Sequence, residues 1–178
     1  MSAFVEFDKI PRLNRECVVT EKIDGTNACI VVDEDGSVRA QSRTQIITPD
    51  DDNFGFARWV HDNVEALRAA LGPGHHFGEW WGLGIQRNYG LTEKRFSLFN
   101  VARWEGAPLP ARVHVVPVLW RGKFSTEAIH AAADLLRVNG SSAAPGFMKP
   151  EGVVVWHEAA RTMFKMTLER DSEWKGKR

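Results

Sequence analysis

Hydrophobic and polar positions change their period several times along this chain of 178 residues. Apolar residues recur in steps of three and four over 53–71, which predicts an amphipathic helix. A second helix is predicted over 126–138, with Ser125 as N-cap and Gly140 at its end. Alternating or β-branched apolar runs predict strands at 18–22, 28–32, 37–41, 76–81, 95–104, 113–120, 152–157 and 162–167.

Short turns connect most of these predicted strands, and two helices are convincing. This order predicts an α+β fold built on antiparallel sheet rather than a βαβ repeat. The length and the 43% apolar content are typical of one domain with a sizeable core. Charged side chains interrupt positions 6–15, so the chain does not begin like a signal peptide, and no apolar run is long enough to cross a membrane. We therefore expect a cytoplasmic protein in which Cys17 and Cys29 are buried and reduced.

The formal net charge of zero is a cancellation between segments. Residues 33–65 hold eight acids and three bases, whereas 84–137 hold eight bases and four acids, and 161–178 hold six bases and three acids. Within the acidic segment, Asp50, Asp51 and Asp52 precede the first helix and suit its positive end. A net charge of zero argues against bulk electrostatic coating of nucleic acid but is compatible with a local basic groove.

The sharpest local motif is the turn Lys22-Ile23-Asp24-Gly25, which directly follows a predicted strand. Alternation places Lys22 and Asp24 on one side of the chain. Taken alone, such a turn is more typical of an ordinary hairpin with a solvated lysine. The motif gains weight from the segments that follow it in order, namely Ser42-Arg43, Phe77 to Gly82, Phe96 to Val101, Glu151 to Val155 and Phe164 to Thr167.

This ordered series resembles the covalent nucleotidyltransferase superfamily of ATP-dependent ligases and capping enzymes, and is most similar to phage RNA ligases related to RNA-editing ligases. The resemblance runs from about residue 16 to 168. It implies a nucleotidyltransferase (adenylation) domain over 1–168, a short basic tail over 169–178, and no OB-fold or other C-terminal domain. The implied partners are RNA ends or nicks, in RNA repair and in the host cytoplasm for a phage protein, with a helper protein in place of the missing domain.

The implied reaction uses ATP and Mg²⁺ or Mn²⁺. Lys22 would attack the α-phosphorus of ATP, and the resulting lysyl-AMP would pass AMP to an RNA 5′-phosphate, which a 3′-hydroxyl then seals. A free lysine has a pKa of about 10.4, so burial and nearby positive charge are needed to make the amine nucleophilic. The resemblance assigns that charge to Lys165 and the metal, and the metal to Glu151 and Glu79, whose oxygens suit a hard cation.

Further roles follow from the resemblance. Glu21 would lie beside the adenine edge, through its carboxylate or its backbone carbonyl, and Phe99, ahead of Phe96, would stack on adenine. Asn27 would support metal hydration, and Arg43 would grip the terminal 5′-phosphate or the leaving pyrophosphate. Alternatives stay open: Phe99 as core, Glu79 as a strand-edge acid, and Asp24 with Gly25 as plain turn chemistry. Arg87 lies in the glycine-bounded loop 84–90, which either contacts phosphates and bases or is structural.

Two features depart from the family pattern. The last motif reads Lys165-Met166-Thr167 and has one lysine where many relatives have two, so Lys175 or Lys177 is a candidate replacement. The resemblance also leads us to expect that the C-terminal domain of most relatives is missing here. Besides an RNA ligase, the pattern leaves a DNA ligase of the same superfamily and a non-catalytic nucleotide- or nucleic-acid-binding module as alternatives. The presence of the complete set Lys22, Glu79, Glu151 and Lys165 argues against the last.

Overall fold

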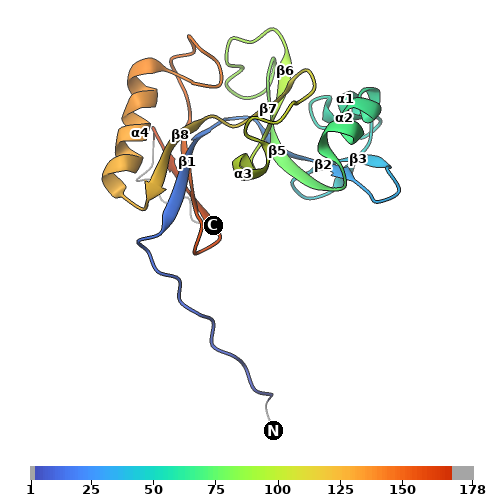
Figure 1. The fold of residues 1–178 in the computed structure, drawn as a ribbon. Coiled ribbons are helices and arrows are strands. Elements are labelled where there is room, and N and C mark those ends of the chain that lie inside the picture. Colours follow the sequence, from blue (N-terminus) through green and yellow to red (C-terminus); the bar gives the residue numbers. More distant parts are fainter. Residues whose placement is uncertain (1–2, 170–178) are drawn as a thin grey trace, which may run out of the picture.

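The computed structural model describes residues 3–169, which form two β-sheets and four helices (Figure 1). This architecture confirms the α+β class. The strands are β1 (Glu16–Lys22), β2 (Thr26–Val32), β3 (Val38–Ser42), β4 (Ile46–Ile47), β5 (Gly74–Gly82), β6 (Lys94–Leu98), β7 (Val113–Val115), β8 (Val118–Lys123), β9 (Gly152–His157) and β10 (Thr162–Thr167). The helices are α1 (Phe56–Asp62), α2 (Val64–Leu71), α3 (Val101–Trp104) and α4 (Thr126–Asn139).

The first sheet has the strand order β10-β9-β1-β8, and all its pairs are antiparallel. Helix α4 packs against one face of it, where Ala133 and Leu136 bury themselves against Val19 and Val155 (Figure 1). Because side chains alternate along a strand, the residues next to these valines in sequence, such as Thr20 and Val154, lie on the face away from α4. That second face carries the end of β1 at Lys22.

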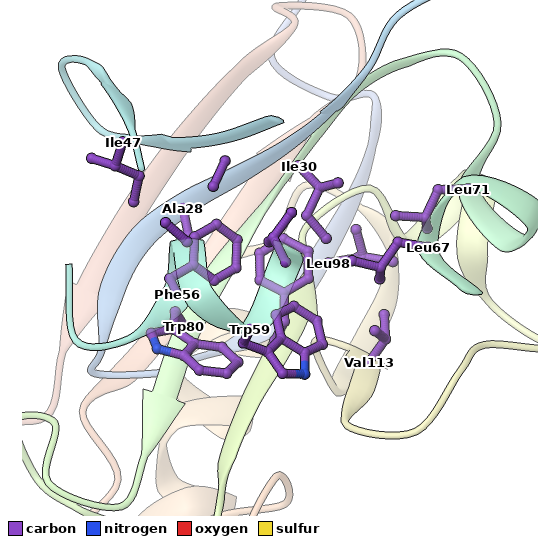
Figure 2. Close-up of a cluster of buried hydrophobic side chains, with 14 of the residues drawn as sticks. Ala28, Ile30, Ile47, Phe56, Trp59, Leu67, Leu71, Trp80, Leu98 and Val113 are labelled. Atoms are coloured by element: carbon purple, nitrogen blue, oxygen red, sulfur yellow. The ribbon is translucent and has the colours of Figure 1, made fainter. Parts of the chain in front are cut away.

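The second sheet has the order β4-β3-β2-β5-β6-β7, antiparallel except for the parallel pair β6–β7. Helices α1 and α2 cover one face and enclose an aromatic core (Figure 2). In that core Phe56 and Trp59 of α1 lie 5.3 and 4.9 Å from Trp80 between ring centroids. Leu67 and Leu71 of α2 extend the same cluster. The opposite face of this sheet contributes the polar residues described below.

The single helix predicted over 53–71 is wrong, because α1 and α2 are separated at Asn63. The side-chain amide of Asn63 donates to the carbonyl of Trp59 at 2.7 Å, and its backbone has non-helical angles. Such side-chain bonding competes with the helical pattern. The start is also later than predicted, since Phe54 and Gly55 have φ values of 53° and 77° in the left-handed region.

The predicted capping by acidic residues is confirmed for Asp52 at the start of α1. Its two carboxylate oxygens accept hydrogen bonds from the backbone amides of Ala57 and Arg58, at 2.7 and 3.0 Å. These are amides that have no partner within the helix, so the carboxylate satisfies them and opposes the positive end of the helix dipole.

Two predicted strands end earlier than expected. The strand predicted over 95–104 stops at Leu98, because the Asn100 side chain accepts from the amide of Arg103 and caps α3. The strand predicted over 113–120 is divided at Pro117, which has no amide to donate. As a result β7 belongs to the second sheet and β8 to the first. The chain thus changes sheets at this proline.

The second predicted helix is confirmed. Helix α4 begins after Ser125, whose hydroxyl accepts from the amide of Ala128, and it is followed by Gly140 at φ 79°. Cys17 and Cys29 are both buried and free, as predicted. Within residues 3–169, no helix has the length and hydropathy to cross a bilayer.

Candidate active site

The turn between β1 and β2 carries Lys22 and is held tightly against β5. Ile23 is buried, and Gly25 lies so close to β5 that a Cβ atom there would sit 2.4 Å from the carbonyl oxygen of Trp80 and 2.7 Å from the Cβ of Trp81. A side chain at position 25 would therefore push the turn away from the sheet. The close approach of the turn to β5 therefore explains why the motif has glycine at this position.

Glu79 on β5 is buried beside that turn. Its Oε1 accepts from the amide of Gly25 and its Oε2 from the amide group of Asn27, both at 3.0 Å. Asn27 and Glu79 are direct partners in the β2–β5 register, which explains their contact. Burial raises the pKa of Glu79 to about 7, against the lowering effects of Lys22 and these hydrogen bonds. Its hydrogen bonds and its place beside Lys22 favour a site carboxylate over an ordinary strand-edge acid.

Lys22 and Glu151 form an ion pair at the same place. The amine Nζ lies 2.7 Å from Glu151 Oε2, and both side chains are largely shielded from solvent. The antiparallel β1–β9 register pairs Lys22 with Gly152, directly after Glu151. A Cβ atom at Gly152 would lie 2.1 Å from the carbonyl oxygen of Met166, so this glycine allows β9 and β10 to approach.

Lys165 lies on the same face of the first sheet as Lys22 but does not contact it. In the register, Lys165 pairs with Val154, which pairs with Thr20, two residues before Lys22. Directly paired residues share a face, so Lys165 and Lys22 face the same side from strands that are two apart. The Lys165 side chain is exposed. The alternative cations Lys175 and Lys177 lie outside the described residues.

Arg87 and Tyr89 brace the turn from the loop 84–90. Arg87 Nε is 2.9 Å from Asp24 Oδ2, and its Nη1 donates to the carbonyl of Lys149 at 3.0 Å. The Tyr89 hydroxyl accepts from the amide of Asp24 at 2.8 Å. Arg87 thus joins the segment that follows Lys22 to the segment that precedes Glu151.

Tyr89 was not singled out from the sequence, which left the loop 84–90 as either a phosphate- and base-contacting segment or a structural one. It is buried, packs edge-on against Trp81 at 4.8 Å and contacts Phe147. A buried ring cannot offer a face to a ligand, so the structural interpretation of this loop holds for Tyr89. A single tyrosine among polar residues carries no local signal that predicts its burial.

Glu21 is buried with its carboxylate bound to a loop. The carboxylate accepts from the Ser141 hydroxyl at 2.5 Å and from the amides of Ser142 and Ala143 at 2.7 and 2.9 Å. Burial raises the pKa of Glu21, and these three bonds partly offset the rise. The side-chain oxygens are therefore occupied, which leaves the backbone carbonyl as the group for the predicted adenine contact. The serine loop was not identified from the sequence.

The two candidate adenine-stacking rings differ in accessibility. Phe96 is completely buried in the core that contains Trp80, so it is not available. Phe99 is half-buried beside the cluster that includes Ile23 and Val116. The order of preference between Phe99 and Phe96 thus agrees with the structure, while the stacking itself remains a prediction.

Arg43 is exposed in the turn after β3 and lines an open hollow of about 470 Å³. Thr26, at the start of β2, and Asn53 line the same hollow, and the Asn53 amide donates to the Thr26 hydroxyl at 2.9 Å. Thr26 immediately precedes Asn27, so the hollow adjoins the Glu79 site along β2. Arg43 therefore borders the site without contacting Lys22, Glu79 or Glu151 in this state.

The carboxylates at the site fit a magnesium-like cation. Glu79 and Glu151 provide oxygen donors beside Lys22, and Glu79 is a buried carboxylate whose pKa burial raises to about 7. Across residues 3–169, no group of three or more His, Cys, Asp or Glu side chains gathers into a metal-binding cluster. Two carboxylates are sufficient for Mg²⁺, which keeps several of its waters and often shares substrate phosphates.

Comparison with known proteins agrees with this geometry. Residues 15–167 match the family described as RNA ligase. Solved structures of RNA ligase variants from Naegleria gruberi have the same fold. One, with ATP and Mn, superposes with a TM-score of 0.64 at 20% identity over 92% of this chain and 53% of that one. Another, with AMP and Mn, gives 0.60 at 21% identity over 87% and 50%.

The family match, together with this two-sheet fold, assigns the chain to the nucleotidyltransferase superfamily. Within that superfamily, the chain belongs to the RNA ligase family. It spans about half the length of the Naegleria ligase chains to which it is similar.

Proposed function

We propose that this chain is an ATP-dependent polynucleotide ligase that seals RNA 3′-hydroxyl and 5′-phosphate ends, as in RNA repair, through a lysyl-AMP on Lys22. The observation that carries the proposal is the convergence of Lys22 at the end of β1, Glu79 on β5 and Glu151 just before β9, which are distant in sequence. These are the residue types needed for attack on a phosphorus and for holding a divalent cation beside it. Family membership supports the same conclusion.

In the first step the Lys22 nitrogen would form a bond to the α-phosphorus of ATP while the bond to pyrophosphate breaks. The attacking amine has to be neutral, whereas in the free protein it is an ammonium paired with Glu151. Glu151 therefore holds the lysine in a resting state, and the amine must lose both this contact and a proton before it attacks. Glu79 keeps the turn that carries the lysine in place through the Gly25 amide.

Glu79 and Glu151 would hold Mg²⁺ or Mn²⁺, which when bound neutralises phosphate oxygens and favours the neutral amine. Lys165 would add positive charge from the same face of the first sheet as Lys22. Phe99 would stack on adenine and the Glu21 carbonyl would accept from its amino group. Arg43 would bind the terminal 5′-phosphate or the leaving pyrophosphate, and Asn27 would support the hydrated metal.

In the later steps AMP would move from Lys22 to the RNA 5′-phosphate, and the 3′-hydroxyl would then displace AMP as the new phosphodiester bond forms. Neither step needs a further nucleophile from the protein. The same positive groups would neutralise the phosphates at each transfer.

The direct test is incubation with ATP labelled at the α-phosphate and Mg²⁺, followed by denaturing electrophoresis. Covalent label is expected on the wild type and on Lys123→Ala, an exposed lysine of β8, and is expected to be absent from Lys22→Ala. Equal labelling of Lys22→Ala would refute the lysyl-AMP. Sealing assays on nicked RNA, nicked DNA and single-stranded ends then define the substrate. Sealing of nicked DNA alone would favour a DNA ligase. No labelling of the wild type at all would favour a non-catalytic binding module.

A further inference from the structure

An exposed aromatic side chain, Phe77, lies on β5 two residues before Glu79. Phe77 and Glu79 are two residues apart on β5 and so project from the same face of the second sheet. Gly78, between them, faces the core, because a Cβ atom there would lie 2.7 Å from the ring of Phe96. Phe77 is 54% exposed, although it is a large apolar residue in the middle of a sheet.

His75 continues this aromatic surface along β5. Its ring stacks on that of Phe77, with centroids 6.1 Å apart and planes inclined by 19°. Glu79 is the next residue after Phe77 on this face of β5, so the rings lead from the start of β5 to the candidate active site. Two nearly parallel, accessible rings form a surface on which a flat aromatic ligand can stack.

Polar and basic residues flank these rings on β3. In the register, Cys29 of β2 pairs with both Phe77 and Gln41, and Val31 pairs with both His75 and Arg39. Gln41 and Arg39 therefore share the face of the two rings. The Arg39 guanidinium is held by Asp33 through two bonds of 2.8 and 2.9 Å. We call Arg39, Gln41, His75 and Phe77 the stacking face.

We propose that the stacking face binds nucleobases of the RNA strand next to its reacting end, with Phe77 as the main platform. This inference rests on the proposed ligase function and extends it to a specific substrate contact. Aromatic side chains stack on successive bases without sequence preference, and basic side chains beside them follow the backbone. The continuity of β5 from Phe77 to Glu79 brings such a strand to the catalytic residues.

The composition of the face favours RNA over a protein partner. Its accessible apolar surface consists of one phenylalanine and one imidazole, bordered by an amide and by a guanidinium that is paired with the Asp33 carboxylate. A protein-binding patch needs a larger contiguous apolar core. Flat rings with polar neighbours suit the flat, polar-edged bases of a nucleic acid.

The test compares Phe77 variants for binding of a fluorescent, single-stranded RNA with a 5′-phosphate, at one fixed salt concentration, by anisotropy. Phe77→Ala is expected to weaken binding by about 5- to 150-fold, the range for loss of one stacked base. Phe77→Leu is expected to be as weak, and Phe77→Trp to bind like the wild type. Phe164→Ala, an equally exposed phenylalanine on the face of β10 opposite Lys165, serves as the matched control and is expected to bind normally.

An abasic substitution in the RNA identifies the stacked base. Moving the abasic site along the nucleotides nearest the 5′ end should weaken wild-type binding at one position and cause no further loss with Phe77→Ala. Such a non-additive cycle shows a direct contact between ring and base. Additive losses at every position would overturn the proposal.

Labelling with ATP separates this inference from the proposed function. Phe77→Ala is expected to form the covalent AMP adduct at the wild-type rate, because the RNA contact is not used in that step. If Phe77→Ala instead loses labelling, the face belongs to the ATP pocket and the inference fails. Unchanged RNA binding by Phe77→Ala also refutes it. A wild type that binds RNA through Phe77 but takes no label would refute the ligase and leave the stacking face intact.

Discussion

The amine of Lys22 lies 2.7 Å from the carboxylate of Glu151, although 129 residues separate them in the chain. Antiparallel pairing of β1 with β9 creates this contact. The side chains are only 22% and 16% exposed, so the pair is less screened by solvent than a surface ion pair. In the free protein, the candidate nucleophile is thus held by the carboxylate that we assign to the metal.

Replacement of Glu151 by glutamine tests this dual role. Glu151→Gln frees the lysine but removes a negative oxygen from the proposed cation site, and we expect lysyl-AMP formation to fall about 100-fold. The rate of labelling at several Mg²⁺ concentrations measures it. Faster labelling than wild type would show that Glu151 only restrains Lys22.

Glu79 is expected to make both stability and activity depend on pH. Burial raises its pKa from the ordinary 4.5 to about 7, so the folded state binds the proton more tightly than the unfolded chain does. The free energy of unfolding therefore falls as the pH rises from about 4.5 to 7, by roughly 3 kcal/mol at most from this group, and is level above that.

Glu79→Gln has no such ionisation and should lose less stability than the wild type over this pH range, which urea denaturation at pH 5 and pH 8 measures. Labelling by the wild type should rise through about pH 7 if the ionised carboxylate is the active form. A parallel pH dependence of stability in the two proteins would contradict the assignment.

Arg87 is predicted to position the site rather than to bind phosphate. Arg87→Ala removes the links to Asp24 and to the Lys149 carbonyl, and we expect slower lysyl-AMP formation, about 10-fold, with little change in the KM for ATP. A phosphate ligand would instead raise that KM. Arg95→Ala is the matched control, because Arg95 forms a similar pair with Glu93 at 2.8 Å and has nearly the same exposure.

Gly25→Ala is expected to displace the turn that carries Lys22. The added methyl would lie 2.4 Å from the Trp80 carbonyl, and overpacking of this kind costs about 1–3 kcal/mol. Thermal denaturation should show a lower midpoint, and labelling should fall further than the loss of folded protein explains. Normal labelling would mean that β5 shifts enough to accommodate the added methyl group.

Glu21→Gln tests whether the Glu21 carboxylate or its backbone carbonyl contacts adenine. The carboxylate is occupied by Ser141 and the following amides, so a substitution there should lower stability by about 1–3 kcal/mol and leave the preference for ATP over GTP unchanged. Competition of GTP with ATP in the labelling assay measures that preference. A relaxed preference would show that the side chain itself contacts the base.

Local patterns in the amino-acid order were sufficient for the α+β class and for α4 with Ser125 as its cap, whereas the resemblance of the ordered motifs to a ligase family pointed to Lys22, Glu79 and Glu151 as site residues. These features depend on periodicity, capping chemistry and motif order, which involve neighbouring residues. The division of the first helix at Asn63 and the change of sheet at Pro117 were not predicted. At Asn63 a side-chain bond to the Trp59 carbonyl competes with the helical pattern, and at Pro117 a missing amide coincides with the pairing of β7 and β8 to different sheets.

Only the tertiary structure decided which groups meet. The Lys22–Glu151 pair, the Glu21 carboxylate in the serine loop, the Arg87 bridge and the exposure of Phe77 all depend on strand register and on packing across more than fifty residues. A chain segment encodes its own turn or helix, whereas the distance between two side chains on different strands is set by the sheet that joins them. In this RNA ligase family member, the motifs predicted which side chains contribute to the site, and the two sheets determined which of them lie together.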